Sequence, residues 1–425
     1  MDASWERVVP RLGRVPSYGE FAVSIFMDAM RDALLTILVD VAQDRFLQLV
    51  KDWPIFSLLA SASSSSLSSS SSSCLHPAFD FLQNAFGPTH TVPVVFPPVE
   101  GCSKRKEMRL TDAIKLMRAH KLSGQEGAVY IKDYHLFRQE RQLARQRQSM
   151  AIPSDSENSV SVAEPQSPEQ LYEPPFPFRD DWMNNIREAK DGDEPDDFAF
   201  CYAGSAGSFT NLHRDVYTSY SWSTNIIGRK RWRLFPPSCI SMLRRFPNVR
   251  TSELASSCDE MDERYSQGKL GPVSEGKDGW PLWGDVRSQA CELLQEAGET
   301  IFVPSNWYHE VLNLTDCISI NHNWCNSYNL ESMYDSMVEE VEDVEASLED
   351  VRSMLQERDI STSVSSSPDW QREWVGIVQQ VARQDAGWAW EGFWDMVEHN
   401  LRSPPTEVST PLAYAGTELL NRKEC

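Results

Sequence analysis

The sequence contains no Cys-x-x-Cys pair, although it holds nine cysteines between Cys74 and Cys425. Closely spaced cysteines usually mark a disulfide framework or a thiolate zinc site. An odd and scattered set argues against both, and most of these thiols are expected to act as small buried apolar groups. We therefore expect a protein of a reducing compartment.

Long apolar runs are also missing. The most apolar early stretch, residues 21–47, is interrupted by the charged residues Asp28, Arg31, Asp32 and Asp40. The first seven residues lack the basic and then apolar order of a signal peptide. We expect no membrane span and no secretion, hence a cytoplasmic location, with an additional nuclear pool left open.

Positive charge is scarce, with 40 Lys and Arg against 62 Asp and Glu and a net charge of −22. This balance argues against direct nucleic-acid binding and favours basic partners. Hydrophobic residues make up 41% of the chain, which is enough for one large core or two modest ones.

Residues 1–148 are expected to form helices and a strand that lead into a larger domain. Apolar spacing predicts an amphipathic helix within residues 15–60 that includes Phe21, Ile25, Leu34 and Leu38. The serine-rich residues 61–73 are expected to be a disordered insertion. A helix over 111–122 and a strand over 128–131 follow. A further helix is expected to carry a solvated basic face made of Arg138, Arg141, Arg145 and Arg147.

Residues 149–177 are rich in Pro, Ser and Glu, which predicts a flexible insertion. Residues 178–330 are expected to form the core. Their segments 197–237 and 297–324 contain short runs rich in Tyr, Trp, Ile and Val, typical of an antiparallel β barrel or sandwich. The polar, glycine-punctuated residues 238–296 between them are expected to be a variable loop.

Residues 331–425 are expected to be helical. Apolar residues recur three and four positions apart from Met333 to Leu355, and residues 331–360 hold eleven acidic and two basic side chains. A second, tryptophan-rich helical region spans 370–401. The simplest interpretation is a helical cap on the barrel, and a homodimer joined through the apolar stripe is the alternative.

The segment Asn211-Leu212-His213-Arg214-Asp215 carries the clearest chemical pattern. In an extended chain, His213 and Asp215 project from one face, so both can bind one metal ion. We expect His309, which follows an apolar strand at 300–303, to be the third ligand. Two histidines and one carboxylate are the ligand set of non-haem Fe(II) oxygenases, and they leave positions open for an oxo-acid and dioxygen.

Lys230 is the candidate partner of such an acid. In the segment Gly228 to Pro237, period-two spacing puts Lys230 on one face with Trp232 and Leu234. A buried ammonium needs an anion, which a bound dicarboxylate would supply, and a lysine that reaches the barrel rim is the alternative. In the last strand, alternation is expected to turn Ser319, Asn321 and Asn323 toward a cavity and His322 away from it, so His322 is expected to be structural.

The motifs NLHRDV, GRKRWRLFPP, GETIFVPSNWYHEVLNL and ISINHNW, in this order, resemble the JmjC (Jumonji C) family of Fe(II)- and 2-oxoglutarate-dependent oxygenases. The likeness is greatest to members that hydroxylate a lysine of the eukaryotic translation release factor. It rests on YIKDYHL at 130–136, DDFAFCYAGSAGS at 196–208, SYSWSTN at 219–225 and HNWCNSYNL at 322–330. One departure is Asn306, where relatives often carry glycine; asparagine also enters left-handed turns readily.

The resemblance implies a double-stranded β-helix (a jelly-roll or cupin barrel) with N-terminal helices and a C-terminal helical region. It implies iron held by His213, Asp215 and His309, with dioxygen as cosubstrate. It also implies that 2-oxoglutarate is bound by Lys230, with Thr210 and Tyr130 as donors and Asn323 near the keto-acid end. Trp222 and Trp307 are expected to be cavity walls.

The activity implied is lysyl hydroxylation of a protein, with the release factor as the suspected partner. Two alternatives stay open at this point. Demethylation of methyl-lysine on histones or other proteins uses the same iron centre, and a cupin-like binding protein would carry a structural metal or none.

Overall fold

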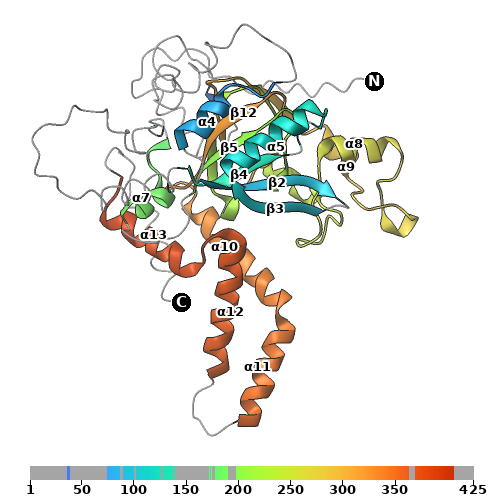
Figure 1. Cartoon of the computed structure of the whole chain (residues 1–425). Coiled ribbons are helices and arrows are strands. Elements are labelled where there is room, and N and C mark those ends of the chain that lie inside the picture. The colour runs from blue at the N-terminus through green and yellow to red at the C-terminus, as the bar shows by residue number, and fades with distance from the viewer. Residues whose placement is uncertain are drawn as a thin grey trace, which may run out of the picture.

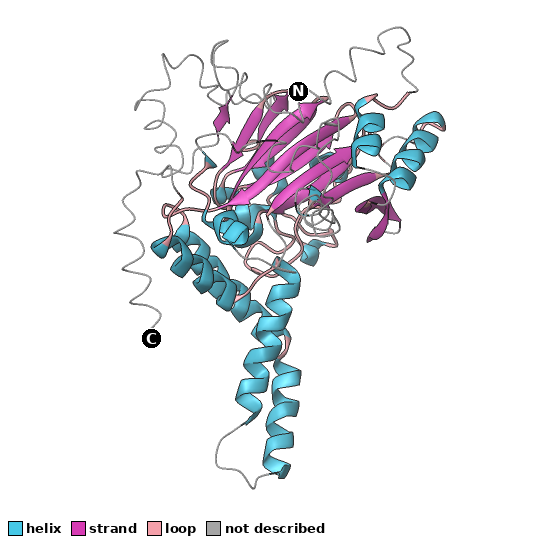
Figure 2. Cartoon of the chain, turned by 60° about the vertical axis from the view of Figure 1, so that its left-hand side comes forward, coloured by secondary structure: helices cyan, strands magenta, loops and turns pink. Residues whose placement is uncertain are grey.

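The computed structural model describes residues 36–38, 74–86, 90–99, 102–125, 127, 129–136, 138, 172, 174, 178–189, 198–362 and 369–405. Two antiparallel β-sheets form the body of the molecule, and helices lie outside them (Figure 1). A helical arm extends from one end of this body, as Figure 2 shows most clearly. The expected fold class, mainly β with flanking helices, is confirmed.

The larger sheet has eight strands. Their order across the sheet is β1 (Thr36–Leu38), β10 (Thr300–Val303), β7 (Tyr220–Ile227), β12 (Cys317–Trp324), β5 (Ala199–Gly204), β4 (Tyr130–Tyr134), β2 (Thr91–Val99) and β3 (Cys102–Arg109). The smaller sheet has the order β6 (Phe209–Arg214), β11 (Tyr308–Asn313), β8 (Lys230–Phe235) and β9 (Cys291–Gln295). Strands far apart in sequence therefore become neighbours, which is how residues near 213 and 309 meet.

Two helices cover the outer face of the larger sheet, α4 (Ala78–Phe86) and α5 (Leu110–Leu122). The helix α5 agrees with the prediction for 111–122. Leu110, Ala113, Ile114 and Met117 recur at helical spacing and are buried against the sheet. In its last turn, the Lys121 ammonium forms a buried ion pair with Asp316, 2.7 Å away, which fixes the helix to the start of β12.

Four strands are not evident from the sequence. The helix expected through Leu38 is wrong at β1, which adds three residues to the sheet edge beside β10. Prolines obscure the strand pattern of β2, and charges obscure that of β3. Those charges suit β3 because it is an edge strand, where they discourage pairing with other chains. The fourth strand, β9, lies within the expected loop 238–296.

Other expectations fall outside the described residues. These are the rest of the 15–60 helix, the serine-rich residues 61–73, Arg141, Arg145 and Arg147, and residues 149–177 apart from Tyr172 and Pro174. Among described residues, no helix is long and apolar enough to cross a membrane. The seven cysteines that the structure describes are all free thiols.

Residues 238–296 are folded rather than a loop, and they share an apolar core with Leu212, Phe235 and Tyr308 of the smaller sheet. They form η4 (Pro237–Leu243), α8 (Cys258–Ser266), η5 (Val273–Glu275) and α9 (Trp283–Arg287) before β9. The unit is joined to the smaller sheet through Arg233 on β8, whose Nη1 lies 2.6 Å from Asp259 Oδ1 in α8 and 3.2 Å from Glu310 Oε1 on β11. The other carboxylate oxygen of Glu310 accepts a hydrogen bond from the Cys258 backbone N–H at 2.8 Å.

The C-terminal residues form α10 (Leu330–Ser347), α11 (Glu349–Thr362), α12 (Asp369–Ala386) and α13 (Trp390–Arg402). The predicted apolar stripe is divided between two cores. Met333 and Met337 pack beside α7 (Trp182–Ala189) and α13, whereas Val344 and Leu355 pack against α12 to form the arm. The stripe is thus covered within the chain, and dimerisation through it stays a prediction.

Candidate metal centre and its cavity

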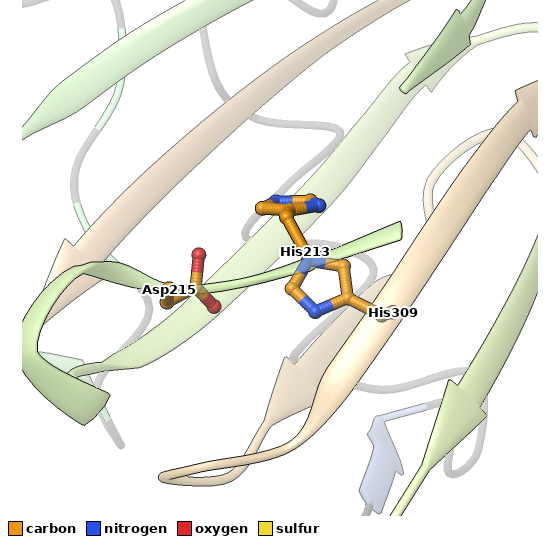
Figure 3. A group of neighbouring side chains, drawn as sticks. All are labelled: His213, Asp215 and His309. Atoms are coloured by element: carbon orange, nitrogen blue, oxygen red, sulfur yellow. The ribbon is translucent and has the colours of Figure 1, made fainter. Parts of the chain in front are cut away.

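His213, Asp215 and His309 converge at one end of the smaller sheet (Figure 3). His213 lies near the end of β6 and is directly opposite His309 on β11, and their ring centroids are 4.3 Å apart. Asp215 follows β6 immediately. One ligand atom from each residue lies within 4.8 Å of the others, which is the spacing required to hold a single metal ion. The structure thus brings the three predicted ligands together across 96 residues of sequence.

The electrostatics of the group suit a divalent cation. Burial lowers the pKa of His213 and that of His309, so both imidazoles are neutral and offer lone pairs. His213 Nδ1 lies 2.8 Å from the Asn211 carbonyl oxygen and donates to it, which leaves Nε2 as the ligand atom. Two imidazoles and one carboxylate on one side of an ion are the donor set that Fe(II) takes in oxygenases.

Asp215 is held from two directions. One of its carboxylate oxygens accepts a hydrogen bond from the Ser221 hydroxyl at 2.8 Å. The loop that follows it places two bulky residues in the left-handed region, Tyr217 (φ 46°) and Thr218 (φ 53°). Such backbone conformations are strained and persist only where the surroundings impose them.

The C-terminal helices impose this conformation. The buried Tyr217 hydroxyl donates to the Trp388 carbonyl oxygen at 2.9 Å, next to α13. The Thr218 hydroxyl lies 3.1 Å from the Ser332 carbonyl oxygen in the first turn of α10. Helices far along the chain therefore help to position the metal-binding carboxylate.

A cavity between the two sheets adjoins the three ligands. It is lined by Tyr130, Tyr202, Thr210, Ser221, Ser223, Lys230, Trp232, Val311, Asn321 and Asn323, together with the three candidate ligands. All four residues predicted to contact 2-oxoglutarate line this cavity: Lys230, Thr210, Tyr130 and Asn323. Tyr130 is hydrogen-bonded through its side chain to Thr210.

Lys230 is the buried cation of this cavity, with 2% of its surface exposed. Its ammonium donates to the Ser319 hydroxyl at 2.6 Å. Burial lowers its pKa to about 8, and no carboxylate among the described residues forms an ion pair with it. A buried ammonium without a counter-ion, in the same cavity as a candidate metal centre, fits a small acid that bridges the two.

The face assignments in β12 agree with its alternation. Asn321 and Asn323 point into the cavity, whereas His322 stacks on Trp222 with ring centroids 4.4 Å apart. The expectation that Trp222 is a cavity wall is wrong. The same period of two that puts Ser221 and Ser223 on the cavity side of β7 turns Trp222 into the core of the larger sheet. Trp307 packs beside the smaller sheet and is also not among the lining residues.

Besides Val311, three lining residues were not predicted, Tyr202, Ser221 and Ser223. Each lies on a strand where alternate residues are core aromatic or small apolar groups, so alternation could have identified them once the inward face was known. Asn306 adopts the left-handed conformation (φ 65°), in agreement with the expectation for this position. Its side-chain oxygen accepts a hydrogen bond from Arg214, 3.2 Å away, and this helps direct Arg214 away from the metal centre.

Comparison with known proteins agrees with this geometry. The cupin-like domain family matches residues 49–330, which include both sheets' cavity strands and the three ligands. The chain belongs to the cupin-like family. The resemblance to JmjC proteins within it is confirmed by the relatives described next.

A relative from Danio rerio, "2-oxoglutarate and iron-dependent oxygenase JMJD4", is 34% identical over 233 residues, covering 55% of this chain and 44% of its own. The protein of the same name from Homo sapiens is 32% identical over 329 residues, covering 76% of this chain and 64% of its own. "Arginine-specific demethylase JMJ20" of Arabidopsis thaliana is 32% identical over 263 residues, covering 59% of this chain and 47% of its own. This cupin-like chain thus spans about half to two thirds of the length of these relatives.

Proposed function

We propose that this protein is an Fe(II)- and 2-oxoglutarate-dependent oxygenase that hydroxylates a lysine side chain of a protein, and that the translation release factor is its substrate. The observation that carries the oxygenase assignment is the placement of His213, Asp215, His309 and the buried Lys230 ammonium around one cavity. Relatives named for iron and 2-oxoglutarate support it. The release factor is supported only by the sequence motifs.

In this proposal, each residue has a positional role. The two imidazoles and the Asp215 carboxylate hold the iron on one side, so that its other positions face the cavity. Lys230 and Ser319 bind the distal carboxylate of 2-oxoglutarate, and Tyr130 and Thr210 donate to it. Bound iron and 2-oxoglutarate supply the capacity to activate dioxygen and oxidise a C–H bond.

The walls of the cavity control water and substrate. Trp232 and Val311 give the side of the smaller sheet an apolar surface, which limits the water that reaches the reacting atoms. The net charge of −22 favours encounter with a basic protein segment, as expected for a substrate that presents lysine. In this proposal, the protein encounters the release factor in the cytoplasm.

The direct test is intact-mass analysis of purified release factor after incubation with the protein, Fe(II), 2-oxoglutarate and air. We expect a gain of one oxygen atom, which tandem mass spectrometry assigns to a lysine, and no gain with the His213→Ala variant. Succinate formed in the same reactions separates the two parts of the proposal. Succinate that depends on His213, without any change in the release factor, would retain the oxygenase and reject this substrate.

A second candidate is demethylation of a methylated arginine or lysine. The observation that favours it is the match to the Arabidopsis arginine-specific demethylase. Peptides bearing methylated arginine or lysine would release formaldehyde together with succinate if it is correct. A hydroxylase would give succinate and a stable hydroxylated product with no formaldehyde.

A further inference from the structure

The strand β4 is interrupted beside the cavity. Its pairing with β5 shifts register between Ile131 and Tyr134, so that Lys132 and Asp133 form a bulge. Asp133 adopts the left-handed conformation, with φ 57°. Bulges redirect side chains, and non-glycine residues held at positive φ concentrate at functional sites. The bulge therefore has the backbone features of a binding position.

The side chain of Tyr202 connects the Asp133 carboxylate to the cavity. Tyr202 lines the cavity, and its hydroxyl donates to Asp133 Oδ1 at 2.8 Å. Burial raises the pKa of Tyr202 well above its ordinary value, so its phenol stays protonated and remains the donor. The Asp133 side chain is itself 28% exposed and can be reached from solvent.

The arrangement of charge gives Asp133 a specific use. Asp215 is the single carboxylate among the described residues that line the cavity, and it is a candidate metal ligand. A cationic substrate group would be repelled by a bound metal cation and attracted by Asp133, the carboxylate that Tyr202 holds beside the cavity.

We propose that Asp133, held by Tyr202, pairs with the cationic end of the substrate side chain and so selects an ammonium or guanidinium group over a neutral one. This inference rests on the proposed oxygenase function and adds the class of side chain that the cavity accepts. Without such a partner, a cation brought into a partly buried site would lose its hydration uncompensated.

The existing partner of Asp133 does not block this role. Arg105 Nη1 lies 3.0 Å from Asp133 Oδ2, but the Arg105 side chain is 55% exposed. Ion pairs in such exposed positions are weak because water competes with them. A carboxylate offers about four lone pairs, and Tyr202 and Arg105 use two of them, so a substrate cation can join or displace Arg105.

The test uses three sets of peptides that differ only in the central residue, which is lysine, arginine or the neutral isostere norleucine. Initial rates of succinate formation at low peptide concentration report kcat/KM for the full-length protein with Fe(II) and 2-oxoglutarate. Asp133→Asn removes the charge, keeps an oxygen that accepts from Tyr202, and keeps a residue type that tolerates positive φ. Asp112→Asn, on the exposed face of α5, is the matched control.

We expect the wild-type protein and Asp112→Asn to use lysine or arginine peptides roughly tenfold better than norleucine peptides, as a charge-assisted pair provides. Asp133→Asn should remove most of this preference by slowing turnover of the cationic peptides alone. Equal use of cationic and neutral peptides by the wild-type protein, or no response to any of the three sets, would overturn the inference. So would an unchanged preference in Asp133→Asn. The proposed function is judged separately, by whether succinate formation depends on His213.

Discussion

Replacement of Lys230 by methionine separates two effects of the buried ammonium. The pKa of Lys230 is lowered to about 8 from an ordinary value of 10.5, which corresponds to a penalty of about 3 kcal/mol for the charged group in the unliganded protein. Methionine keeps the length and volume of the chain without that penalty. In the liganded protein, the same substitution leaves a carboxylate of 2-oxoglutarate buried without its cation.

Two opposite results follow from these energies. The affinity for 2-oxoglutarate should fall by roughly 100-fold in Lys230→Met, because a buried carboxylate that loses its partner is penalised by several kcal/mol. The unliganded variant should be at least as stable as the wild-type protein at neutral pH. Lys115→Met, on the exposed face of α5, should change neither property.

The pH dependence gives an independent check. Because the pKa of Lys230 is lower in the folded state, the unfolded chain binds more protons between about pH 8 and 10.5. The stability of the unliganded wild-type protein should therefore rise over this range relative to Lys230→Met. Calorimetric titration with 2-oxoglutarate, using Mn(II) in place of Fe(II), and urea unfolding at several pH values measure both effects. If Lys230→Met bound 2-oxoglutarate within about threefold of wild type, or if its stability changed with pH in parallel with wild type, Lys230 would not be the buried partner of the carboxylate.

Three further predictions concern the surroundings of the metal centre. Tyr217→Phe leaves the buried Trp388 carbonyl without its donor, so unfolding should become easier by about 1–2 kcal/mol and Mn(II) affinity should fall several-fold, measured by denaturation and metal titration. An unchanged metal affinity would show that the C-terminal helices do not position Asp215. Arg233→Leu leaves Glu310 buried and uncompensated, and should lower stability by about 3–5 kcal/mol, whereas adding Glu310→Gln should restore part of the loss. Because burial lowers the pKa of both metal-binding imidazoles, the loss of Mn(II) affinity on acidification should be centred below pH 6.5; a loss centred at or above pH 6.5 would contradict this.

Short-range patterns predicted the parts of the fold in which one face of an element is buried. Helix α5 and the cavity strand β12 have clear periods of three to four and of two, and both predictions agree with the structure. The strand β9 also alternates buried Cys291, Leu293 and Gln295 with less buried residues, but its short length and polar surroundings concealed it. Strands β2 and β3 could not be inferred from apolar alternation, because prolines and edge charges replace it.

The candidate site was predictable where a motif fixes chemistry within a few residues. His213 and Asp215 share a face by local geometry, and His309 and Lys230 follow from the requirement for a third ligand and an anion partner. The positions of Tyr202, Asp133 and Trp222 depend on which face of each strand points inward and on a bulge in β4. Those features are set by pairing between distant strands, which local sequence does not encode.

The division of the apolar stripe between two cores has the same cause. Its spacing predicts helices but does not say what covers them, and the partners α12 and α13 come from residues 369–402. Tertiary contacts therefore determine which elements cover the apolar stripe, which its periodicity alone does not predict. The same contacts connect the C-terminal helices to the loop that carries Asp215.

The most direct test is a crystal structure of the protein with Mn(II) and 2-oxoglutarate, recorded with anomalous scattering from manganese. The assignment of the metal centre predicts one manganese peak within bonding distance of His213, Asp215 and His309, with the distal carboxylate of 2-oxoglutarate on Lys230. A peak bound elsewhere, no peak at saturating Mn(II), or a 2-oxoglutarate carboxylate that does not contact Lys230 would contradict it.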